Sequence, residues 1–342
     1  MKKCFAWILL IPLTLSLVGC GLFTPGIPYE FSYSSSQNYT AGSTTLENAT
    51  ALDTVFVSWY AGNVTVETHQ ESTVIIEETA TGVTDDAQRV HYWYQRSQHG
   101  DGDVLFVEFG KSGLKDYDGV QKDLRILLPE NDRYHISFTG DSSNFYLDVD
   151  NYENTLAKLS ATTNCGDVHA NLYHADTVQV AGNNVDKDGV ESKSYQLNAI
   201  GKIGTLGMNS TYAKIIINAD WVASMDNVGS VCNETRFTAN KAGNIKIQNV
   251  QGITHIQVKE FSSMDLQLRE KPVYIYIPKD CGFTLRITRE KYFDGEEDLV
   301  SDVVEIGFEG FTKISDTEYK VGNSEKTIHV TTYNEIHVLP LD

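Results

Sequence analysis

The chain has 342 residues, of which 46 are acidic and 27 are lysine or arginine, so its formal net charge at pH 7 is −19. This charge argues against nucleic acid as a partner, because phosphate binding requires clustered lysine and arginine. The acidic surface favours solubility. It is also compatible with weak binding of divalent cations, although it defines no site.

The first residues, 1–19, have the features of an export signal. Lys2 and Lys3 give a positive start, and an almost uninterrupted apolar run extends from Phe5 to Leu17. That run is shorter than the roughly 20 residues that a membrane-spanning helix needs. No later segment is long and apolar enough to span a membrane, so we interpret 1–19 as a cleaved signal peptide.

The signal ends in Leu17, Val18, Gly19 and Cys20, which resembles the lipobox of bacterial lipoproteins. The resemblance implies that Cys20 receives a lipid whose acyl chains, such as palmitate, hold the protein to the membrane. Each buried methylene contributes about 0.8 kcal/mol to such anchoring. An ordinary signal peptide with a chance cysteine is the alternative. The expected location is the bacterial cell envelope, outside the cytoplasm.

Residues 20–50 are predicted to be the lipidated cysteine followed by a flexible tether. The stretch is rich in Ser, Thr, Gly, Asn and Tyr and has little aliphatic periodicity. The segment Tyr29–Tyr33 is an alternative strand that could join a sheet edge. The folded domain is therefore expected to begin near residue 51.

Over 51–288, apolar and polar residues alternate in short runs, as in strands with one buried face. Apolar pairs recur at steps of eleven, ten, nine and ten residues: Ile245 and Ile247, Ile256 and Val258, Leu266 and Leu268, Ile275 and Ile277, Leu285 and Ile287. A spacing of roughly 8–12 residues is typical of a β-sandwich or barrel. It also suits a solenoid with about 20 residues per coil.

A short motif of glycine, a polar residue and a branched aliphatic residue recurs before the expected strands. Its copies are Gly62-Asn63-Val64, Gly166-Asp167-Val168, Gly201-Lys202-Ile203, Gly229-Ser230-Val231 and Gly243-Asn244-Ile245. Glycine permits a positive φ at a tight corner. The repetition favours an all-β solenoid, with a β-sandwich as the alternative.

Four other segments have predicted roles. His91–Gln95 and Val104–Phe109 are expected to pair as a hairpin, and Leu124–Pro129 is expected to be a strand that ends at its proline. Residues 289–342 change in character and contain further short strands at 327–330 and 335–338. We predict that 289–342 is a C-terminal β cap over the open end of the stack.

The succession Val55–Thr68, then Leu124–Pro129, then repeated glycine-led strands resembles the putative-adhesin family of bacterial β-strand-repeat proteins. The resemblance covers about residues 50 to 335. It implies a right-handed β-solenoid at the cell envelope and supplies no catalytic residues. The insertion Asp186–Gly189 departs from the family pattern and leaves the coil register around 180–200 open.

No catalytic, metal or cofactor site is expected. The sequence has no Gly-x-Ser-x-Gly elbow and no His-Glu-x-x-His pattern, and the five-residue offset between His169 and His174 would point them to opposite faces of a strand. The oxygen-rich stretches Asp148–Asn151 and Asp186–Glu191 complete no EF-hand loop and are interpreted as turns.

Three cysteines remain once Cys4 is removed with the signal and Cys20 is assigned to lipid. These are Cys165, Cys232 and Cys281. One disulfide with one free thiol is open to a protein outside the cytoplasm. Buried thiols that pack as small apolar residues are the preferred alternative.

Aromatic residues are the candidates for a binding face, namely Trp59, Tyr60, Trp93, Tyr94, Tyr274 and Tyr276. Alternation with inward aliphatic residues predicts that Tyr274 and Tyr276 face out, although cross-strand tyrosines often only stabilise a sheet. We expect a non-catalytic surface lipoprotein that binds a glycan or a surface protein in adhesion, scaffolding or envelope stress. A carbohydrate-active β-helix enzyme and a spacer without a ligand are the alternatives.

Overall fold

The computed structural model of the chain describes residues 32–97, 102–115, 120–130, 133–150, 155–183, 193–289, 301 and 303–341. These residues form one 22-stranded sheet, with two 3₁₀ turns, η1 (Ser36–Asn38) and η2 (Asp86–Gln88). The all-β prediction is confirmed. No helix in this part of the chain is long and apolar enough to cross a membrane. The predicted signal and Cys20 lie outside the described residues.

The strands differ widely in length, since a long strand can run through a bend and contribute to two faces of the molecule. In chain order they are β1 (Thr40–Ala41), β2 (Thr44–Leu46), β3 (Leu52–His69), β4 (Val74–Thr81), β5 (His91–Gln95), β6 (Asp103–Glu108), β7 (Gln121–Pro129), β8 (His135–Val149), β9 (Thr155–Thr163), β10 (Val168–Leu172), β11 (His174–Asn183), β12 (Ser194–Thr211), β13 (Lys214–Val231), β14 (Glu234–Asn249), β15 (Ile253–Leu268), β16 (Val273–Pro278), β17 (Phe283–Thr288), β18 (Val304–Ile306), β19 (Thr312–Ser315), β20 (Glu318–Val321), β21 (Thr327–Thr331) and β22 (Ile336–Leu341).

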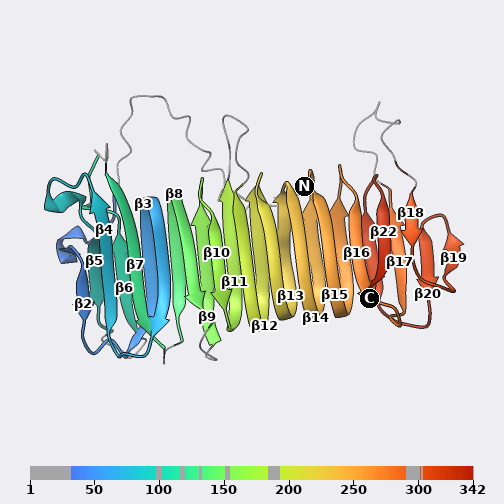
Figure 1. Cartoon of the computed structure of the whole chain (residues 1–342), viewed down its shortest axis with the longest axis horizontal. Helices are drawn as coiled ribbons and strands as arrows, with labels where there is room; N and C mark the ends of the chain where they lie inside the picture. Colours follow the sequence, from blue (N-terminus) through green and yellow to red (C-terminus); the bar gives the residue numbers. More distant parts are fainter. Residues whose placement is uncertain are drawn as a thin grey trace, which may run out of the picture.

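From β8 to β16 the strands pair in parallel and stack along the long axis of the molecule (Figure 1). Tyr195 lies opposite Ile215, and the same column continues through Thr235, Thr254 and Val273 at steps of 20, 20, 19 and 19 residues. This step matches the predicted coil, and the parallel pairing differs from the antiparallel hairpins of a sandwich. The right-handed solenoid assignment stays a prediction.

Each step of the stack, which we call a coil, contributes two strand segments that pair with different neighbours. The first half of β12 pairs with β10, whereas its second half pairs with β11. One apolar row joins the register partners Leu197, Ile217, Phe237, Ile256 and Ile275, none more than 1% exposed. Burying such a side chain stabilises a fold by about 1.5–3 kcal/mol, so stability accumulates coil by coil.

The recurring glycines mark bends where two backbones come close. Of the five, only Gly62 and Gly229 have a positive φ, of 96° and 117°, so that expectation is wrong for the other three. A Cβ on Gly243 would lie 2.0 Å from the carbonyl oxygen of Ala223 in the preceding coil. The glycine is therefore required at that position by close approach and not by a left-handed backbone.

The polar residue of the motif links neighbouring coils at the bend. The Asn63 amide donates to Asp123 Oδ1 (2.8 Å), and Asn144 Nδ2 donates to Asn63 Oδ1 (3.0 Å). The Asp167 amide donates to Asn144 Oδ1 (2.9 Å), and the Ser194 amide donates to Asp167 Oδ1 (2.7 Å). A ladder of side chains thus satisfies backbone donors that the bend removes from the sheet.

At the N-terminal end, spatial order differs from chain order. Strand β3 lies between β8 on one side and β6 and β7 on the other. The predicted β5–β6 hairpin is confirmed, and β4 pairs antiparallel with β7. Strands β1 and β2 pair with β5 and β4, so the tether prediction is wrong for residues 36–46, which form η1 and these two edge strands.

The C-terminal end shows a second change of order. Strand β21 lies between β15 and β17, and β22 lies between β16 and β18, all in parallel. Strand β20 pairs antiparallel with β17, and β19 with β20 at the outer edge (Figure 1). The cap prediction is therefore corrected for β21 and β22: these strands form an internal coil, because they carry the aliphatic alternation that the core requires, whereas β19 and β20 lie at the outer edge.

Candidate functional site

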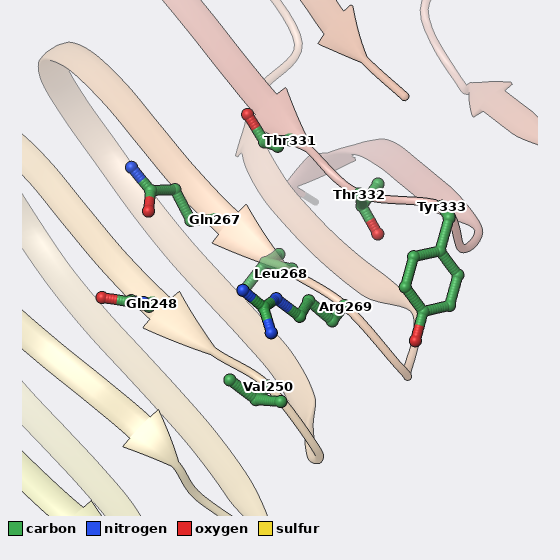
Figure 2. A pocket seen from close by; sticks show the side chains of 8 residues that line it. All are labelled: Gln248, Val250, Gln267, Leu268, Arg269, Thr331, Thr332 and Tyr333. Atoms are coloured by element: carbon green, nitrogen blue, oxygen red, sulfur yellow. The ribbon is translucent and has the colours of Figure 1, made fainter. Parts of the chain in front are cut away.

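A pocket of about 140 Å³ opens at the corner where β14, β15 and β21 end. It is lined by Gln248, Val250, Gln267, Leu268, Arg269, Thr331, Thr332 and Tyr333 (Figure 2). A cavity of about 150 Å³ can hold benzene. The pocket therefore has room for one six-membered ring.

One wall of the pocket is an outward row of polar side chains. Gln248 lies opposite Gln267, and Gln267 lies opposite Thr331, on three adjacent parallel strands. Strand alternation points this row outward because the residues before it face the core. In Figure 2 the Arg269 side chain lies between Gln267 and Val250.

The turn that carries Arg269 is held by hydrogen bonds. The Arg269 amide donates to the Asn249 carbonyl (3.2 Å), and the Glu270 amide donates to the Val250 carbonyl (3.0 Å). Asn249 is 1% exposed, and its Nδ2 donates to the Gly252 carbonyl (3.1 Å). The side chain of Arg269 therefore projects from a fixed backbone.

The opposite wall is tied down in the same way. The Asn334 amide donates to Thr332 Oγ1 (3.0 Å), and Asn334 Nδ2 donates to the Glu270 carbonyl (2.9 Å). Arg289 Nη1 donates to the Asn334 carbonyl (2.7 Å). The Asn334–Glu270 bond joins the turn after β21 to the turn after β15, and the Arg289 bond joins it to the end of β17, so the pocket is preformed.

The lining groups define what the pocket could bind. They are amides, hydroxyls, the guanidinium of Arg269 and the aliphatic side chains of Val250 and Leu268, and no aspartate, glutamate or histidine is among the eight lining residues. A guanidinium binds a carboxylate or a sulfate through paired hydrogen bonds. Amides and hydroxyls both donate and accept, which suits a ligand rich in hydroxyl groups.

The two tyrosines predicted for a binding face do not line this pocket. Tyr274 and Tyr276 are half-buried and alternate with buried aliphatic residues, which agrees with an outward orientation. The Tyr274 ring is stacked between His255 (5.1 Å, 11°) and His337 (4.6 Å, 8°). Since both ring faces are covered, only its edge and hydroxyl can meet a ligand, and a role in binding stays a hypothesis.

Two other aromatic candidates are engaged in contacts within the sheet. Trp93 stacks on Phe106 (5.3 Å, 18°), and Phe106 stacks on Phe56 (5.3 Å, 14°). The Tyr94 hydroxyl donates to Asp103 Oδ2 (2.6 Å). These rings form a ladder along adjacent strands, an arrangement that stabilises sheets.

The N-terminal end contains a buried ion pair that the sequence analysis did not predict. Lys122 Nζ lies 2.7 Å from Glu78 Oε1, with side chains 0% and 2% exposed. The ammonium also lies 4.2 Å from the Phe109 ring centroid and 5.0 Å from that of Trp59. Burial lowers the pKa of Lys122 to about 8, although Glu78 opposes this shift. Trp59 is 1% exposed, so its assignment to a binding face is wrong.

The pattern around Lys122 contains the signal that could have revealed the pair. Lys122 shares the parity of Leu124, Ile126 and Leu128, and all four side chains face the core. A lysine at an inward position of an alternating strand requires a buried anion nearby. The sequence could not identify that anion as Glu78, because the β4–β7 pairing is antiparallel and nonlocal.

The two histidines lie apart and serve separate neighbours. His169 stacks on Tyr146 with centroids 5.4 Å apart, whereas His174 Nδ1 accepts a hydrogen bond from the Lys202 amide (2.8 Å). Among the described residues, no group of three or more His, Cys, Asp or Glu could hold a metal ion.

The structure also describes the three cysteines, Asp148 and Asp150, which the sequence analysis singled out. No disulfide joins Cys165, Cys232 and Cys281, and burial raises the pKa of Cys232 to about 12. Burial raises the pKa of Asp148, and the neighbouring Asp150 raises it further. The stretch 186–191 and the lipobox Leu17, Val18, Gly19 and Cys20 lie outside the described residues.

No family model matches the chain, and no curated protein matches it. One solved structure that is similar is described as a putative cell adhesion protein from Clostridium sporogenes. It is 12% identical, the match covers 88% of this chain and 98% of that one, and the TM-score is 0.27. At so low a TM-score the similarity supports no conclusion about the fold or the function of this chain.

Proposed function

We propose that the protein is a lipid-anchored, extracytoplasmic binding protein of the bacterial envelope that acts in adhesion. Its ligand would be a glycan, and the pocket around Arg269 would hold one sugar residue bearing a carboxylate or a sulfate. The observation that carries this proposal is the preformed, ring-sized pocket whose polar lining consists of amides, hydroxyls and one guanidinium. The anchor is inferred from Cys20 and the residues before it.

The same lining argues for binding without turnover. Glycoside hydrolysis generally uses a pair of carboxyl groups on either side of the scissile bond, and the eight lining residues include no carboxyl group. The pocket could therefore orient a sugar without supplying an acid and a base. Binding and release would leave the glycan intact.

The carbohydrate-active alternative has a different location. Glu67 and Asp148 are register partners on β3 and β8, and Asp150 is close enough to raise the pKa of Asp148 after the larger effect of burial. Glu67 is engaged by Arg125 at 2.7 Å. If the protein cleaves a polysaccharide, substitution of Asp148 and Asp150 by asparagine should abolish that turnover.

The direct test is binding of residues 21–342 to an array of bacterial and host glycans, with calcium and with a chelator. We expect saturable binding to acidic glycans, and a loss of about tenfold or more in Arg269→Gln, as for one charge-assisted hydrogen bond. Arg286→Gln removes the same charge outside the pocket and should bind normally. The double variant Tyr274→Ser/Tyr276→Ser should also bind normally.

The outcomes separate the alternatives. Binding that survives Arg269→Gln but disappears in the tyrosine variant would move the site to the tyrosine face. If the protein binds no glycan saturably, either with calcium or with chelator, the result would contradict the proposal and favour a spacer. Release of shorter saccharides from any polysaccharide would instead favour the enzyme.

The anchor has its own test. We expect Cys20→Ser to abolish labelling by radioactive palmitate and to remove the protein from the lipid-anchored fraction, because the thiol is the acceptor that the lipobox implies. Cys4→Ser is the matched control, since that cysteine would leave with the signal. Equal labelling of both variants would contradict the lipoprotein assignment.

A further inference from the structure

The coil made by β21 and β22 is inserted between two coils that precede it in the chain. On one face, β21 pairs with β15 and β17, so Asp265, His329 and Arg286 form one row across the three strands. On the other face, β22 pairs with β16 and β18. The segment 327–341 therefore fills a slot whose walls are the strands β15 and β16 on one side and β17 and β18 on the other.

The walls of the slot hold the segment 327–341 through apolar packing and backbone hydrogen bonds. Ile328, Val330, Ile336 and Val338 are each 0% exposed and extend the apolar rows of the neighbouring coils. Backbone bonds continue at the corner: the Val273 amide donates to the Glu335 carbonyl (3.1 Å). All of this is strand pairing and row packing, the interactions by which an added strand binds a sheet.

The link between the outer edge and the inserted coil is short. Residues 322–326 join β20, which stays paired with β17, to β21. Gly322 in this link has a positive φ of 59°, a conformation that glycine adopts without strain. A change of conformation within 322–326 could direct the segment 327–341 away from its own slot while β17 to β20 remain in place.

We propose that this slot accepts the segment 327–341 of a second copy, so that two copies exchange β21 and β22 and join at their C-terminal ends. Each exchanged segment makes the contacts that it makes in one chain, and only the short link differs, which is the condition for domain swapping. Reciprocal exchange gives a closed dimer with twofold symmetry. The occupant is a copy of this chain, because its inward residues already match the rows of the slot.

Cysteine pairs at register positions can report the exchange. Asp265 and His329 are Cα partners on β15 and β21, and half of each side chain is exposed, at 48% and 45%. Register partners on paired strands have the spacing that a disulfide needs. In residues 21–342 with Cys165→Ala, Cys232→Ala and Cys281→Ala, the double variant Asp265→Cys/His329→Cys should close its disulfide and so verify fold and register.

The exchange itself is tested with single variants. Asp265→Cys chains and His329→Cys chains are mixed, refolded together from urea at several concentrations and oxidised. We expect disulfide-linked heterodimers whose fraction rises with concentration. The matched control mixes Asp265→Cys with Lys246→Cys, because Lys246 is the Cα partner of Asp265 on β14, a strand that is not exchanged.

Several-fold more heterodimer in the first mixture than in the control supports the exchange. Equal amounts in both mixtures, while the double variant still closes its own disulfide, would overturn it. Neither result depends on a glycan ligand, so failure of this inference leaves the proposed function untouched, and the converse also holds.

Discussion

The coils β12 to β15 and the N-terminal end around β3 to β7 differ in the side chains that fill their inward positions. In the middle coils most inward positions are apolar and meet their counterparts one coil away, as Ile217 meets Leu197 and Phe237. At the N-terminal end the strands come from distant parts of the chain, and the core contains Lys122 paired with Glu78.

This difference has energetic consequences. A row of aliphatic side chains is stabilised by apolar burial alone. Truncation of one side chain therefore destabilises mainly the coils next to it. A buried ion pair stabilises its surroundings only while both partners are present, because a single buried charge has no compensation. The N-terminal end should therefore be more sensitive to one substitution than the middle coils.

The largest effect is expected for Lys122→Met. It leaves the Glu78 carboxylate 2% exposed and without its ammonium partner, which costs about 3–5 kcal/mol. The measurement is urea unfolding followed by tryptophan fluorescence, since Trp59 contacts this cluster. The double variant Glu78→Leu/Lys122→Met is the control and should recover most of the loss. Equal destabilisation of both variants would show that shape, and not charge, matters here.

Next in size is Ile217→Ala in a middle coil, which should cost about 3 kcal/mol of unfolding free energy because the cavity cannot close within a continuous row. Ile217 is 0% exposed. The loss should reduce hydrogen-exchange protection in β12, β13 and β14 and leave the N-terminal end protected. A uniform loss of protection over the whole chain would instead show that the stack unfolds as one unit.

Alternation was enough to predict the strands of the middle coils and their buried positions, because the alternating residues of each strand mark its inward face, as Ile245 and Ile247 do in β14. It could not predict the inserted coil, since the alternation within a short strand such as 327–330 does not show which strands will pair with it. The pocket has the same limit: Gln267 and Thr331 become neighbours only through that insertion. Lys122 was missed because a charged residue at an inward position contradicts the pattern used to find strands.

A pH dependence should again distinguish the two regions. Burial raises the pKa of Glu108 from 4.5 to about 7, against the smaller opposing effect of a hydrogen bond from Ser58. The folded state then keeps a proton that the unfolded state releases, so stability falls as pH rises from about 4.5 to 7, by about 2 to 3 kcal/mol. Glu108→Gln should lose this fall in urea titrations at several pH values. An unchanged dependence would contradict the shift.

The smallest contrast separates two glycines of the middle coils. Gly243→Ala places a Cβ 2.0 Å from the Ala223 carbonyl oxygen, whereas at Gly207 the nearest atom is the Asn227 carbonyl oxygen at 3.6 Å. We expect Gly243→Ala to cost about 1–3 kcal/mol, as overpacking does, and Gly207→Ala to be neutral or to stabilise by about 0.4–1 kcal/mol through the unfolded state. Thermal and urea unfolding of both variants measure the difference. If Gly243→Ala is as stable as Gly207→Ala, the coils can move apart at the bend, and close approach does not explain why glycine recurs there.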